Sequence, residues 1–190
     1  TRPAVSSLVS MFEDMEIPAT WCFVGKLLDE ESLNSDLLSA DVRQVCNMSG
    51  EEMTWKGLDL LEMIRESRVP HDLGSHSFFH CRTRIDFMTE ELFREDLSNC
   101  TSTFNKMGLR PVSFIFPFNE VRWTSVLAEK GFTSFRGNNH HEWIETSNSA
   151  ARKCLALLRM TGFRSIRTEL PTLEQEGLWR VPGTVFFSIA

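Results

Sequence analysis

The sequence predicts an α/β fold in which helices connect the strands of a mainly parallel sheet. Short apolar runs alternate along the chain with segments in which apolar residues recur at helical spacing. The connections between these segments are short, and no internal repeat or low-complexity tract interrupts them. Such alternation is typical of βα units, which build either an open sheet or a barrel. In both, the chemistry is expected at the C-terminal ends of the strands.

The first half of the chain contains two predicted helices and two predicted strands. Apolar residues from Val5 to Met15 recur at helical spacing, and this helix must end near Pro18 because the residue before a proline avoids the α region. The nearly continuous apolar run over residues 19–24 predicts a strand buried on both faces. Residues 58–64 indicate a second helix, and residues 72–76 form the end of a strand.

The second half continues the alternation. Thr89 can cap a third helix, where Glu90 and Glu91 lie near the positive end of the helix dipole, and Gly108 marks its end. The remaining expected elements are a strand over 112–116, a helix over 120–130 closed by Gly131, a strand over 132–136, a helix over 150–160 and a last apolar run over 184–189.

Length and charge limit the classes of protein that fit. The chain has 190 residues, of which 42% are hydrophobic, so we expect one packed domain over residues 1–190. The net charge of −6 argues against binding to nucleic-acid phosphates or to anionic membranes. No apolar run approaches the ~20 residues of a membrane helix.

Cysteine usage indicates a reducing compartment. The five cysteines are odd in number and widely spaced, and no C-x-x-C pair occurs among them. This pattern favours reduced thiols, which fill the core as small apolar groups, over a disulfide framework or a zinc ribbon. We therefore expect a cytoplasmic protein, with a secreted protein as the alternative because the chain does not begin with Met.

The segment His71–His80 carries the strongest functional signal. His76 and His80 are four residues apart, a spacing that on a helical turn places both imidazoles on one face. Two convergent imidazoles are a recurrent arrangement for zinc, although a catalytic zinc usually takes three protein ligands and water. The spacing alone also fits paired surface or core histidines. Its position after a strand end favours a metal site.

This segment resembles the second conserved motif of NodB-type polysaccharide deacetylases, carbohydrate esterase family 4, which reads roughly H-E-[IL]-G-[NS]-H-[ST]-x-x-H. Residues 17–25 are similar to the strand that precedes the motif in the family. Residues 114–119 fall where the third motif, R-x-P-[YF]-[GN], belongs, and residues 131–137 resemble the strand that follows it. The pair Glu142-Trp143 lies about where the fourth motif has Asp-Trp.

The resemblance implies a distorted (β/α)7-type barrel of the glycoside hydrolase/deacetylase kind. It also implies a divalent metal, most often zinc, held by one aspartate and by His76 and His80. A metal-bound hydroxide would attack the N-acetyl carbonyl of an amino-sugar polymer or saccharide, with a carboxylate as base and a histidine as acid. The substrate-binding residues that it implies are Pro117, Phe118, Asn119 and Trp143.

The sequence departs from the family at several catalytic positions. The acidic first motif is expected just upstream of Thr1 and the acid histidine beyond Ala190, so both the base and the acid are expected outside the chain. The arginine of the third motif falls at Ile115, and relatives with an arginine after the proline would carry it at Phe118.

Other polar residues are candidates for the site. Arg122 and Arg136 could take the place of the missing arginine, although a local partner at the strand end is the favoured interpretation for Arg136. His71 is interpreted as a structural or supporting group. His140 and His141 could supply a ligand or an acid, although a solvated loop is favoured.

Three functions remain open from the sequence. The first is a metal-dependent deacetylase of N-acetylated sugars. The second is a catalytically degenerate relative that binds carbohydrate or a protein, which the missing arginine supports. The third is an allantoinase-like amidohydrolase of a small C–N substrate on the same fold.

Overall fold

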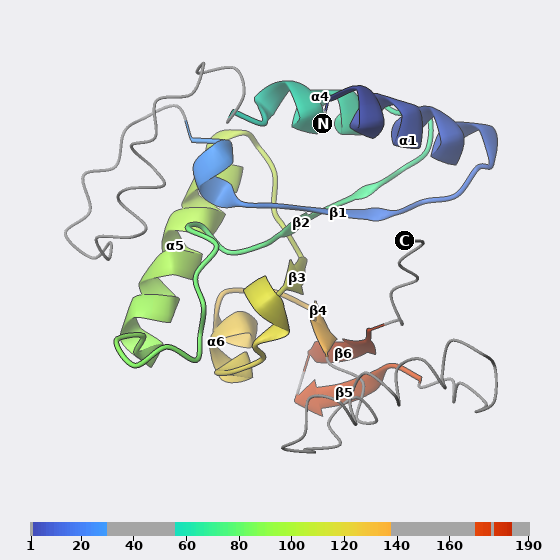
Figure 1. Ribbon diagram of the computed structural model, residues 1–190. Coiled ribbons are helices and arrows are strands. Elements are labelled where there is room, and N and C mark those ends of the chain that lie inside the picture. The colour runs from blue at the N-terminus through green and yellow to red at the C-terminus, as the bar shows by residue number, and fades with distance from the viewer. Residues whose placement is uncertain (1, 30–55, 138–169, 176, 184–190) are drawn as a thin grey trace, which may run out of the picture.

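The computed structural model describes residues 2–29, 56–137, 170–175 and 177–183. Its elements in chain order are α1 (Arg2–Asp14), β1 (Thr20–Phe23), η1 (Gly25–Leu27), α4 (Leu58–Arg65), β2 (Asp72–Ser75), α5 (Glu90–Lys106), β3 (Ser113–Ile115), η2 (Pro117–Asn119), α6 (Thr124–Glu129), β4 (Ser134–Gly137), β5 (Thr172–Gln175) and β6 (Leu178–Pro182) (Figure 1).

The strands form one six-stranded sheet in the order β1-β2-β3-β4-β6-β5. All neighbouring pairs are parallel except β5 and β6, which are antiparallel. Helix α1 lies beside α4, and α5 lies beside α6 (Figure 1). The predicted α/β class and mainly parallel sheet are confirmed. The described strands form an open sheet with β1 and β5 at its ends, so the expected closure into a distorted barrel is not confirmed.

Most predicted elements are present because their local signals agree with the packing. The Thr89 side chain accepts a hydrogen bond from the Leu92 amide at 3.3 Å and caps α5, as predicted. Gly108 follows the end of α5 with φ +70°, a left-handed conformation that glycine adopts without strain. Gly131 closes α6 in the same way, with φ +83°.

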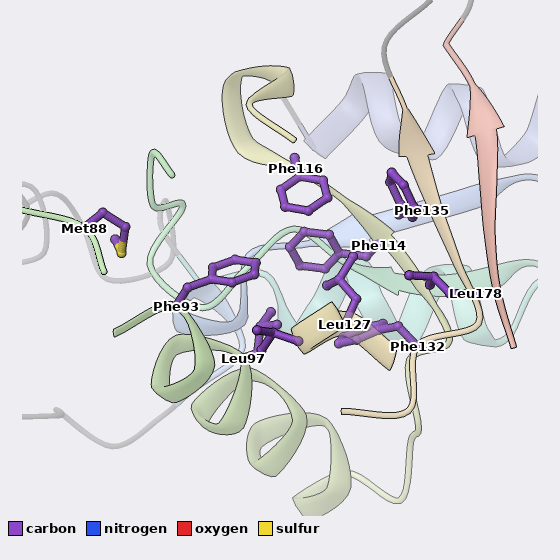
Figure 2. Packing of buried hydrophobic residues seen from close by; sticks show 10 residues of the cluster. Met88, Phe93, Leu97, Phe114, Phe116, Leu127, Phe132, Phe135 and Leu178 are labelled. Atoms are coloured by element: carbon purple, nitrogen blue, oxygen red, sulfur yellow. The ribbon is translucent and has the colours of Figure 1, made fainter. Parts of the chain in front are cut away.

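The main core consists largely of phenylalanine side chains (Figure 2). Phe93 of α5 packs on Phe114 and Phe116 of the β3 segment, with ring centroids 6.2 and 5.9 Å apart. Phe135 of β4 lies 5.8 Å from Phe116. These contacts fix α5 against the middle of the sheet, and hence fix the ends of β2, β3 and β4 relative to one another.

A second, smaller cluster lies between α5 and the start of the sheet. Its fully or almost fully buried members are Leu28, Leu61, Phe78, Cys100 and Phe104. Phe78 belongs to the loop between His76 and His80, so this loop is anchored in the core by one large side chain. Through these two clusters, α5 packs against both the sheet and the loop between His76 and His80.

Two predicted elements differ from the structure. Strand β1 is not buried on both faces: Thr20 is exposed and the other three residues are half-buried, because β1 is at an end of the described sheet. The helix predicted over 120–130 begins only at Thr124, since Trp123 has a left-handed backbone (φ 54°). The backbone and side chain of Glu120 bond a neighbouring loop instead.

The hairpin of β5 and β6 was not predicted. Gly177 turns the chain with φ +77°, and Leu178 is fully buried and joins the main core. The other described residues of the hairpin are exposed or half-buried, whether they are polar or apolar, so the apolar residues of the segment do not mark one buried face. The elements predicted over 150–160 and 184–189 lie outside the described residues. No helix in the described part of the chain is long and apolar enough to cross a membrane.

Candidate active site

Three segments that carry polar or aromatic side chains meet at one edge of the sheet. Strands β2, β3 and β4 are neighbours and parallel, so their C-terminal ends lie side by side. His76 follows directly after β2, the short helix η2 follows β3, and Arg136 lies near the end of β4. The sequence therefore places its candidate metal ligands and substrate-binding residues where this fold gathers functional groups.

His76 is held in one orientation and one tautomer. Its amide donates to the Phe23 carbonyl at 2.8 Å, which extends the ladder between β1 and β2. Its Nδ1 lies 2.7 Å from the Ile115 carbonyl oxygen. A carbonyl oxygen only accepts, so we assign the proton to Nδ1, which leaves the lone pair on Nε2. Burial lowers the pKa of His76 and favours this neutral form.

The rings of His76 and His80 are adjacent, with centroids 4.7 Å apart and an interplanar angle of 69°. The predicted convergence is present, but the predicted helical turn is wrong. The loop contains two non-glycine residues with left-handed backbones, Ser77 (φ 63°) and His80 (φ 57°). These two residues bend the chain back so that the second imidazole returns to the first. Partial burial also lowers the pKa of His80.

The carboxylate of Asp96 reaches this loop from α5. It accepts from the amides of Phe78 and Phe79, both at 2.9 Å, and from the Cys81 thiol at 3.4 Å. Asp96 is 4% exposed. Our sequence analysis missed it. The signal was its position on the apolar face of α5, between Phe93 and Leu97, where an acid needs a buried partner.

The helix η2 places one predicted substrate-binding residue, Phe118, beside His80 and another, Asn119, beside Arg136. Phe118 is 57% exposed, and its ring centroid lies 5.0 Å from that of His80. The Arg82 guanidinium carbon lies 4.8 Å from the Phe118 ring centroid. Asn119 accepts a hydrogen bond from Arg136 at 2.6 Å. Pro117 is buried below them, so its role in the described structure is to shape the turn.

Glu120 joins the loop after His80 to the loop after β3. Its carboxylate accepts from the Arg82 guanidinium at 2.6 and 3.0 Å and from the Arg84 amide at 3.1 Å. These donors lower the pKa of Glu120 against the opposing effect of burial. Arg122 stacks on Trp123 at 4.0 Å and donates to the Thr83 carbonyl at 3.1 Å. Arg122 is therefore part of this loop contact, whereas Arg136 is next to the candidate site.

The contacts of His71 and of the described cysteines indicate that these residues stabilise the fold. His71 Nδ1 accepts from the Ala19 amide at 3.1 Å, and its ring packs at edge angles against Phe12 and Trp21. Burial raises the pKa of both Cys22 and Cys100 to about 12, so both thiols are protonated. Their surroundings fit the predicted role as small core groups, and the Cys81 thiol donates to Asp96.

Two of the three metal ligands that the family resemblance implies, His76 and His80, are adjacent in the described residues. Within residues 2–29, 56–137 and the β5–β6 hairpin, no group of three His, Cys, Asp or Glu side chains is arranged to hold a metal. The predicted sugar-binding Trp143, and the candidates His140 and His141, lie outside the described residues.

Comparison with known protein families agrees with this geometry. The sequence model of the family described as polysaccharide deacetylase matches residues 2–133, which include both histidines and η2. The chain belongs to the polysaccharide deacetylase family. No curated protein matches the sequence significantly. In this deacetylase-family chain, the register partner of Ile115 on β4 is Arg136.

Proposed function

We propose that the protein is a metal-dependent hydrolase that removes N-acetyl groups from an amino-sugar polymer or saccharide. Family membership supports deacetylation of carbohydrates. The observation that carries the metal-dependent part is the pair of imidazoles 4.7 Å apart, with His76 Nε2 left free by the bond from Nδ1 to Ile115.

The donor set suits zinc. Imidazole nitrogen is a preferred zinc ligand, and burial favours the neutral, ligating form of both His76 and His80. The carbonyl partner of His76 Nδ1 is the kind of outer contact that orients metal-binding histidines. A catalytic zinc takes three protein ligands, so the proposal requires one more from outside the described residues. Such a metal, when bound, supplies an activated water and polarises the amide carbonyl.

The residues of η2 would hold the sugar. Phe118 presents an exposed aromatic face next to His80, and such a face suits the apolar side of a pyranose ring. Arg136 holds Asn119 at 2.6 Å and orients its amide beside this ring. We expect Trp143 to contribute a second aromatic face.

The test combines metal binding with turnover. The full-length protein should bind zinc stoichiometrically and release acetate from N-acetylglucosamine oligomers. His76→Gln and His80→Gln should each lose zinc and turnover. His71→Asn is the matched control, because it replaces a histidine of the same motif whose described contacts are structural. Stoichiometric zinc with no acetate release on a broad panel of acetylated saccharides would argue strongly against the proposal.

A catalytically degenerate carbohydrate-binding relative is the second candidate. It is favoured by Ile115 and Phe118, which stand where relatives carry an arginine. In this case calorimetry would detect binding of acetylated oligomers, and no acetate would be released. Including allantoin and similar small amides in the same panel tests the remaining alternative, an amidohydrolase of a small C–N substrate.

A further inference from the structure

We propose that Asp96 is a positioning residue, whose carboxylate holds the loop between His76 and His80 in the conformation that brings the two imidazoles together. This inference rests on the proposed metal-dependent function and adds to it a residue that touches neither metal nor substrate. It makes the geometry of the site depend on helix α5.

The hydrogen bonds of Asp96 hold the middle of this loop. Asp96 accepts from two consecutive amides, those of Phe78 and Phe79, at 2.9 Å each. These amides belong to the middle of the loop, between the two histidines. Two bonds to neighbouring peptide groups fix both their positions and their orientations, which a single bond would not do. The third donor, the Cys81 thiol, lies just after His80.

The loop has a strained backbone that contacts from outside the loop must hold in place. Ser77 and His80 both have left-handed backbones, a conformation that side chains other than glycine rarely adopt and that persists only when the surroundings impose it. The surrounding contacts are specific: Ser77 Oγ accepts from the Cys81 amide at 3.1 Å, and the Gly25 amide donates to the Ser77 carbonyl at 2.9 Å. Asp96 is the charged member of this set.

Asp96 is a buried acid, so it needs hydrogen-bond donors around it. Asp96 is 4% exposed on a helix face that otherwise carries Phe93, Leu97 and Cys100. An acid at such a position is costly unless donors surround it. The histidine loop provides the donors, so the acid and the loop depend on each other.

The test compares Asp96→Asn with Leu97→Ala in the full-length protein. Asn keeps the size of the side chain but turns one acceptor into an NH2 group that faces an amide. Leu97, the next residue, belongs to the main core and has no polar side-chain group that could bond the loop. Zinc dissociation constants come from chelator competition, and the free energy of unfolding from urea titration. We expect Asp96→Asn to weaken zinc binding about 10–100-fold. Leu97→Ala should destabilise the fold and leave zinc affinity within about 3-fold of the wild type.

A metal-free measurement separates this proposal from the proposed function. In the zinc-free wild type, nuclear Overhauser effects should connect the rings of His76 and His80, and Asp96→Asn should lose them. If the wild type binds no zinc, the metal-dependent function fails, and the ring contacts still decide the role of Asp96. Ring contacts and zinc affinity that survive in Asp96→Asn would overturn the proposal, as would an equal loss of affinity in Leu97→Ala.

If Asp96→Asn does not fold, hydrogen exchange of the wild type replaces it. The amides of Phe78 and Phe79 should exchange more slowly once zinc is bound, because binding and these hydrogen bonds stabilise each other reciprocally. Identical exchange of both amides with and without zinc would count against the proposal.

Discussion

Gly74 occupies a position in β2 where a methyl group has no room. A Cβ built there would lie 2.7 Å from the Cys22 sulfur of β1 and 2.9 Å from the Ser113 backbone oxygen of β3. The second distance is about 0.5 Å short of the 3.4 Å at which ordinary contact begins. A backbone oxygen cannot rotate away, so Gly74→Ala must push apart strands that pair across the site.

The expected loss of stability follows from overpacking, which lowers the free energy of unfolding of proteins by about 1–3 kcal/mol. We expect Gly74→Ala to lower the free energy of unfolding, measured by urea denaturation, by about this amount. Zinc affinity should fall as well, since His76 lies two residues further on and is oriented by Ile115 of β3. The double variant with Cys22→Ala removes the sulfur and should recover part of the loss.

Gly108→Ala is the matched control. Nothing lies within 4 Å of the added Cβ, but the backbone has φ +70°, so only the conformation is strained, at about 1–2 kcal/mol. Zinc affinity should not change in this variant. A Gly74→Ala protein within about 0.5 kcal/mol of the wild type, with unchanged zinc affinity, would show that the strands can separate freely and would refute the reasoning.

Three further predictions concern stability, pH and substrate binding. Phe93→Ala should lower the free energy of unfolding by about 3–5 kcal/mol, since Phe93 is fully buried against the rings of β3; a loss under 1 kcal/mol would contradict the packing. The pKa values of His76 and His80 lie below their ordinary value of 6.5 in the folded protein, so the unfolded chain takes up protons first. The stability of the zinc-free protein should therefore fall as pH drops below about 7, until the folded pKa values are passed. The double His→Gln variant should show a flatter urea-midpoint profile, and an identical profile would disprove this. Phe118→Ala, at an exposed position, should change stability by less than about 0.5 kcal/mol. It should raise KM for acetylated oligosaccharides, and an unchanged KM would remove Phe118 from the sugar site.

The limits of a helix or strand were predictable from the sequence where one nearby residue determined them. Thr89 and Gly108 set the limits of α5 through a side-chain cap and a left-handed stop, and neither depends on distant contacts. The edge position of β1 was not predictable, because the same apolar run fits a central strand. The β5–β6 hairpin was missed because only Leu178 points its side chain fully into the core.

The sequence predicted that His76 and His80 lie close together, but not the backbone conformation that brings them together. The four-residue spacing of His76 and His80 suggested a helical turn, whereas two left-handed residues make the same convergence. Nothing in the spacing distinguishes these two paths. The role of Asp96 depends on a contact between α5 and a loop earlier in the chain, and Arg136 meets Asn119 only through the pairing of β3 with β4.

Helix α5 has consequences for anyone who tries to redesign this protein. The helix carries both Phe93, the aromatic anchor of the main core (Figure 2), and Asp96, the acid that reaches the loop between His76 and His80. Larger side chains at Phe93 or Leu97 would overpack the core and push the helix away from the sheet, and the carboxylate of Asp96 would move with it. Stabilising changes are therefore better sought on the exposed side chains of α1, a helix that packs on α4.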